Sequence, residues 1–171
     1  TLVVLVYRSL RWLEWCMARV DAAEPHARYR WLVIANDATN EVSADPRISL
    51  QFRNDDPNEF YINRVYRAWN EGVAMAPTPL VCMLNSDMFA SDHWLDELLL
   101  VKKRNPRTVP TSLLVESGRL PSAMPEHVRN FGMNPGEFDA DEFRVHADTI
   151  RRRDALDAGR LYMPILVDRQ E

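Results

Sequence analysis

Residues 80–87 read LVCMLNSD, an apolar run that ends abruptly in an amide, a hydroxyl and a carboxylate. A short apolar run bounded by polar residues is typical of a strand that is buried on both faces of a parallel sheet. In open parallel sheets, ligands bind at the carboxyl ends of the strands. The sequence therefore predicts that Asn85, Ser86 and Asp87 lie at a ligand-binding edge.

Three earlier segments have the same character as this strand. Residues 2–7, 31–35 and 48–52 are apolar or alternating runs that also stop at polar residues. Between the strands, residues 10–20 and 62–76 carry apolar side chains at three- and four-residue spacing, which indicates amphipathic helices. The order of these elements predicts an α/β fold, with a Rossmann-like, mostly parallel sheet flanked by helices.

After the strand predicted over residues 80–84, the alternation of strand and helix patterns is less regular. Ser91 is suited to cap a further helix, because a serine oxygen accepts hydrogen bonds from the first backbone N–H groups. Residues 108–115 predict another strand, residues 143–153 a helix and residues 161–167 a last strand. Residues 116–142 contain several prolines and glycines and predict a long loop, which in a compact domain is usually functional.

Bulk composition limits the class of protein. The 171 residues are 46% hydrophobic, which fits a single domain with a sizeable core, and the net charge of −4 argues against nucleic-acid binding. Cys16 and Cys82 lie in apolar stretches and predict core residues in a reducing compartment. No apolar run is long enough to span a bilayer, so we expect a cytoplasmic protein. The chain starts inside a strand and stops after an apolar run, and we interpret residues 1–171 as a fragment cut at both ends.

A divalent metal is the ligand that Asp87 suits best. The preceding buried strand fixes this carboxylate at the sheet edge, and a hard cation takes one or two protein carboxylates together with diphosphate oxygens and water. The alternative for Asp87 is an acid in a helix-capping loop. The other predicted strands also end in polar residues, namely Tyr7, Arg8, Asn36, Asp37 and Asn54.

Residues 68–87 resemble a known family. The run Asn70-Glu71-Gly72 lies on a predicted helix that ends in small residues and leads into the 80–84 strand and then Asn85-Ser86-Asp87. This order and spacing resemble the family-two glycosyltransferases of the A-type fold, in which an Asn-x-Gly helix leads to a strand and an Asp-x-Asp motif. The resemblance covers nearly the whole chain. Asn36-Asp37 stands where that family has the acid that grips the nucleotide base.

The resemblance implies an inverting transfer of a sugar from a nucleoside diphosphate donor, of the UDP or dTDP type, to a hydroxyl acceptor such as a glycan or glycolipid. It implies a role in cell-surface polysaccharide synthesis, in the cytoplasm or at the inner face of the membrane. Asp87 and Asn85 are expected to hold Mn²⁺ or Mg²⁺, with weak affinity before the diphosphate binds, because an amide replaces the family's first acid. The donor-binding residues implied are Tyr7, Arg8, Asn36, Asp37, Asn54, Asn70, Asn85, Ser86 and Asp87. For Asn70 the alternative is a structural role, in which its side chain hydrogen-bonds the backbone of the sheet.

The acceptor side is expected along residues 116–142. Glu116 and Arg119 would line it or pair with the donor phosphates, and the alternative is a surface turn with an ordinary ion pair. Trp94 is the aromatic residue expected to contact a sugar. The family's catalytic base lies in a segment that would follow Glu171, and within the chain Glu116 is a candidate for that role.

Two other functions remain open. A sugar nucleotidyltransferase has a similar sheet, but that class needs a glycine-rich loop after its first strand, and residues 7–11 contain no glycine. A truncated or degenerate domain would bind a nucleotide sugar without turnover. Pyrophosphate release distinguishes the first of these from a glycosyltransferase.

Overall fold

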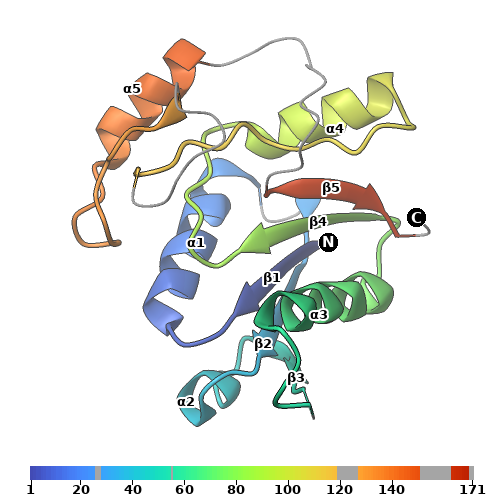
Figure 1. The fold of residues 1–171 in the computed structure, drawn as a ribbon. Helices are drawn as coiled ribbons and strands as arrows, with labels where there is room; N and C mark the ends of the chain where they lie inside the picture. The colour runs from blue at the N-terminus through green and yellow to red at the C-terminus, as the bar shows by residue number, and fades with distance from the viewer. Residues whose placement is uncertain (26–27, 55, 119–126, 151–162, 170–171) are drawn as a thin grey trace.

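The sheet and its strand order define the fold. The computed structural model describes residues 1–25, 28–54, 56–118, 127–150 and 163–169. In this part of the chain the strands lie in the order β3-β2-β1-β4-β5, with β5 antiparallel to β4 and the other pairs parallel (Figure 1). The prediction of an α/β fold with a mostly parallel sheet is confirmed. The strands are β1 (Leu2–Val6), β2 (Trp31–Asn36), β3 (Ile48–Phe52), β4 (Leu80–Asn85) and β5 (Ile165–Asp168).

Helices cover both faces of the sheet. Figure 1 shows α3 on one face and α1 with α4 on the other. The side chains agree with this view, because the residues of α1 and α4 share one hydrophobic cluster and those of α3 share another. The helices are α1 (Leu10–Ala23), α2 (Asn40–Ser43), α3 (Tyr61–Met75), α4 (Trp94–Arg104) and α5 (Ala140–Ile150).

Strand β1 is the centre of the core. Its residues are all buried, and they alternate between the two clusters. Val4 and Val6 pack on the side of α1 and α4, whereas Val3 and Leu5 pack on the side of α3. The continuous apolar run at the start of the chain therefore has the burial expected of a central parallel strand.

Gly72 sets the distance between α3 and the sheet. A Cβ atom at this position would lie 2.6 Å from Ile34 Cδ1 and 2.6 Å from Val3 Cγ1. Those contacts are far shorter than the roughly 3.5–4.0 Å optimum for two carbon atoms. The glycine of the Asn70-Glu71-Gly72 run is thus a packing residue that allows close approach of the helix to β1 and β2.

Two predictions for the second half of the chain are wrong. Residues 108–115 form no strand, because Pro110 has no N–H for a ladder, and only Thr111 makes an isolated bridge to Ile165. Ser91 does not cap α4. The N-cap is His93, in a left-handed conformation with φ 62° and no side-chain cap bond.

The predicted start of the last helix is also wrong. Helix α5 begins at Ala140, so the preceding loop ends earlier than residue 142. The Asp139 carboxylate accepts a hydrogen bond from Glu142 N at 2.8 Å and supplies a helix start that the sequence did not reveal. The short helix α2, capped by Thr39, was not predicted either. The rest of the helix expected over 143–153 and the start of the strand expected over 161–167 lie outside the described residues.

Candidate functional site

The carboxyl ends of the four parallel strands lie level with one another. Val6 pairs with Ala35, Leu5 pairs with Asn85, and Asn36 pairs with Phe52. Because β1 lies between β2 and β4, the residues that follow β1 stand between the other two strand ends. We call this site the carboxyl edge, made up of Tyr7, Arg8, Asn36, Asp37, Asn54, Asn85, Ser86 and Asp87.

Asp37 joins the ends of β2 and β3. Its carboxylate Oδ1 accepts a hydrogen bond from Asn54 N at 2.9 Å, and its own N–H donates to Phe52 O at 2.8 Å. The residue has φ 46°, a left-handed conformation that aspartate tolerates better than most residues. Arg64 Nη1 lies 3.6 Å from the second carboxylate oxygen. Asp37 therefore stands at the edge with its charge partly compensated.

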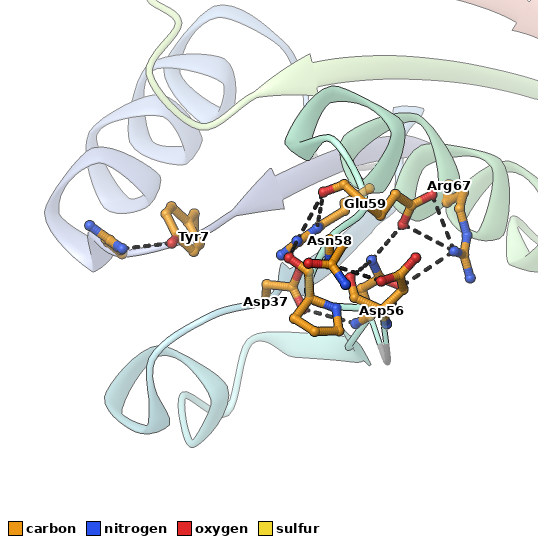
Figure 2. Close-up of polar contacts among 10 residues, drawn as sticks. Tyr7, Asp37, Asp56, Asn58, Glu59 and Arg67 are labelled. Atoms are coloured by element: carbon orange, nitrogen blue, oxygen red, sulfur yellow. Dashed lines mark hydrogen bonds and ion pairs between the residues drawn. The ribbon is translucent and has the colours of Figure 1, made fainter.

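Three residues near Asp37 were not predicted from the sequence as part of the site, namely Glu59, Arg64 and Arg67. Figure 2 shows Glu59 beside Arg67. Both residues contact Asn54, and Arg64 completes the group through its contacts with Asp37 and Glu59. Arg67 Nη1 donates to Asn54 Oδ1 at 3.3 Å and to Glu59 Oε2 at 3.1 Å. Arg64 Nη2 donates to the carbonyl of Glu59 at 2.9 Å. Two arginines at three-residue spacing on a helix are typical of an ordinary solvated face, so their spacing did not indicate this group.

Tyr7 and Arg8 form a separate pair at the end of β1. Tyr7 is 48% exposed, and its hydroxyl accepts a hydrogen bond from Arg8 Nη2 at 2.7 Å (Figure 2). The Arg8 guanidinium also lies 4.5 Å from the centre of the phenol ring. This pair presents an exposed aromatic ring and a cation between the ends of β2 and β4.

Asn36 leaves an acceptor unused at the end of β2. Its side chain is buried, and Oδ1 has no hydrogen-bond partner among the described residues. A buried polar atom without a partner costs about 1–3 kcal/mol. A donor group from a ligand or a water molecule would remove that cost, which makes Asn36 a fitting residue for a ligand site.

Asp87 lies directly after β4 with little compensation of its charge. The residue keeps an exposed surface, yet the protein atoms around its carboxylate exclude enough water to raise the pKa of that carboxyl. Its own backbone N–H is the group that opposes this shift. Burial raises the pKa of the Cys16 thiol on α1 to about 12, and the negative charge of the Asp87 carboxylate adds a smaller contribution in the same direction. An added cation at Asp87 would therefore be stabilised.

The side-chain oxygens at the end of β4 decide whether a metal ion fits there. Asn85 and Asp87 offer one amide and one carboxylate, and both residues are exposed. Among the described residues, no group of three or more histidine, cysteine, aspartate or glutamate side chains is placed to hold a metal. A metal that keeps several waters and takes phosphate oxygens needs only one or two protein ligands, so the residues fit a cation that is shared with a diphosphate.

The raised pKa gives a stability prediction. Ionised Asp87 is disfavoured in the folded state, so the free energy of unfolding falls as pH rises through the ordinary and then the raised pKa. Asp87→Asn, in the absence of metal, is therefore expected to raise the melting temperature at neutral pH. Below about pH 3.8, the ordinary pKa of aspartate, the difference is expected to vanish. Thermal melts of both proteins in EDTA from acid to neutral pH measure it, and a variant that is less stable at neutral pH would contradict the prediction.

Two other site candidates do not join the carboxyl edge, and a third cannot be placed. Asn70 is exposed and lies about 14 Å along α3 from its first residue, Tyr61, given a rise of about 1.5 Å per residue. Trp94 was expected to contact a sugar, but it is 5% exposed and packs in the core with α1 and β4, because its place on the first turn of α4 faces the sheet. Arg119 lies outside the described residues.

Glu116 is half-buried beside Val128. The two residues form an isolated parallel bridge, and the Glu116 carbonyl accepts a hydrogen bond from Arg129 N at 2.8 Å. Its carboxylate Oε2 is buried and has no hydrogen-bond partner among the described residues. Its expected place on the acceptor side stays a prediction.

The comparisons with known proteins add no family. No protein-family model matches this sequence, and no curated protein matches it significantly. In the part of the chain that the structure describes, none of the helices has both the length and the apolar character that crossing a membrane requires.

Proposed function

We propose that this chain is the donor-binding part of a glycosyltransferase, in which a divalent cation links Asp87 to the diphosphate of a nucleotide sugar. The observation that supports this best is the carboxyl edge itself. Four parallel strands end level with one another, and the under-compensated carboxylate of Asp87 follows one of them. In such sheets a ligand binds outside these strand ends.

The proposal gives each part of the carboxyl edge a role. Asn36 and Asp37, at the end of β2, would contact the base, and Tyr7 with Arg8 would lie between base and phosphates. Asn85, Ser86 and Asp87, at the end of β4, would hold the diphosphate through Mn²⁺ or Mg²⁺. A bound cation offsets the negative charge that develops on the leaving diphosphate. The donor would be a UDP- or dTDP-type sugar, and the acceptor a hydroxyl of a glycan or glycolipid.

Thermal melts with UDP and dTDP test the proposal. A ligand at about 100 times its Kd stabilises the folded state by about 2.7 kcal/mol. For a chain of this size, we expect a rise of about 8 °C in melting temperature when the nucleotide and Mn²⁺ are added together. Nucleotide with EDTA, or Mn²⁺ alone, is expected to give much smaller shifts, because the cation needs both sets of oxygens.

The opposite results are equally clear. Absence of a joint shift with either nucleotide would reject the proposed donor site. Release of pyrophosphate from UTP and a sugar 1-phosphate would show that the protein is a sugar nucleotidyltransferase and not a glycosyltransferase. A joint shift without hydrolysis or transfer of the sugar would leave a binding domain that has no turnover.

A further inference from the structure

Helix α1 holds the loop that contains Asp87. We call residues 86–93, between β4 and α4, the Asp87 loop. Cys16 lies beneath its start, with Sγ 3.6 Å from the carbonyl oxygen of Asn85. Trp15 packs on Phe89 with ring centres 5.1 Å apart. Successive residues of one helix therefore contact both the beginning and the middle of this loop.

Arg19, one turn further along α1, makes the polar contacts. Its Nε donates to the Ala90 carbonyl at 2.6 Å, and Nη2 forms an ion pair with Asp92. The guanidinium also lies 5.0 Å from the centre of the Phe89 ring. One side chain thus binds three residues of the Asp87 loop.

Because Arg19 is buried, its contacts restrict the position of the Asp87 loop. The residue is 6% exposed, and a buried guanidinium is costly unless it is paired and hydrogen-bonded. The ion pair lowers the pKa of the Asp92 carboxyl. If the loop moved away, Arg19 would lose both partners while it remained in the core. The cost of leaving the buried guanidinium unpaired therefore favours the one position of the loop in which Arg19 keeps its partners.

We propose that Arg19 is a positioning residue that fixes the Asp87 loop, and with it the Asp87 carboxylate, where a cation can bridge to the diphosphate. This inference rests on the proposed function, because the cation belongs to that donor site. Arg19 itself is not expected to contact metal or nucleotide. It would act on the metal indirectly, by holding in place the loop that carries the ligand. Loss of a residue that orients a metal ligand typically lowers metal affinity by about 10-fold to 100-fold.

The test measures the metal gain, defined as the ratio of the UDP Kd in EDTA to the UDP Kd in Mn²⁺. Arg19→Met keeps a similar volume without the charge. We expect it to lower the metal gain by about 10-fold while the Kd for UDP in EDTA stays the same. A purely structural weakening would change both constants. Amide hydrogen exchange in the Asp87 loop is also expected to accelerate in this variant.

Arg47→Met provides the matched control. Arg47 binds Asp45 through Nε and Nη2, both at 2.7 Å, but has no part in the Asp87 loop. Its loss is expected to reduce stability and leave both the metal gain and loop exchange unchanged. If Arg19→Met fails to fold, Asp92→Asn decides, because the Asp92 side chain is 55% exposed and its change removes only the ion pair. A loss of about 3-fold in metal gain is expected there, the scale of a weakly coupled charge pair.

Failure of the inference and failure of the proposed function look different. If wild type shows a metal gain and the folded Arg19 or Asp92 variant keeps it in full, Arg19 does not position the loop, although the donor site stands. If wild-type protein itself shows no metal gain, the metal-linked donor site and the role of Arg19 are both rejected.

Discussion

Asp87→Ala is expected to abolish the joint stabilisation by UDP and Mn²⁺. The wild-type rise of about 8 °C should fall below about 1 °C under the same conditions, because the cation loses the carboxylate that ties it to the protein. The amide of Asn85 is a weaker ligand and cannot replace a carboxylate. Thermal melts with nucleotide, with Mn²⁺ and with both measure the effect.

A charge-matched control separates a local effect from a general one. Glu71 is exposed on α3, outside the carboxyl edge, and Glu71→Ala removes the same charge. This variant is expected to keep the full joint shift. An Asp87→Ala protein that still shows the wild-type shift would exclude a metal at this position and leave the nucleotide proposal without its cation.

Gly72→Val is expected to cause the largest loss of stability. New side-chain atoms would enter the space now occupied by Ile34 and Val3, where even a Cβ would lie 2.6 Å from each. Overpacking of this kind costs about 3 kcal/mol at the upper end of its usual range, which corresponds to about 10 °C in melting temperature. Chemical denaturation with urea measures the free energy of unfolding.

Ala74→Val, on an exposed position of the same helix, is the matched control. The helix propensity of valine alone costs at most about 0.7 kcal/mol relative to alanine. Because helix propensity favours valine over glycine, it cannot account for a loss at Gly72. A loss in Gly72→Val that is no larger than the loss in Ala74→Val would show that the close packing of Gly72 on β1 and β2 contributes little to stability.

The main strands and helices could be predicted from the sequence because the patterns that indicate them are local. Continuous apolar runs identified β1, β2 and β4, and helical spacing identified α1 and α3. Parallel order follows from the alternation of these elements, and the common edge follows from parallel order. Placement of Asn36, Asp37 and Asp87 at one edge therefore required no knowledge of distant contacts.

The remaining features depend on contacts between distant segments. Arg19 precedes Asp92 by 73 residues, and neither residue is unusual in its own helix or loop. Likewise, Arg64 acquires its place beside Asp37 only when α3 packs on the sheet. Trp94 was misassigned for a related reason, since a first-turn aromatic residue is exposed or buried according to how α4 docks.

If the proposed donor site is correct, the left-handed backbone of Asp37 would limit how its preference for a nucleotide could be redesigned. A change to asparagine keeps a side chain that tolerates φ 46° and alters only charge and hydrogen-bonding capacity. Glutamate would extend the reach of the acid, but longer side chains in this conformation cost about 1 kcal/mol or more. In the proposed site, selectivity for another nucleobase would therefore be easier to obtain through neighbouring side chains than through a longer acid at the end of β2.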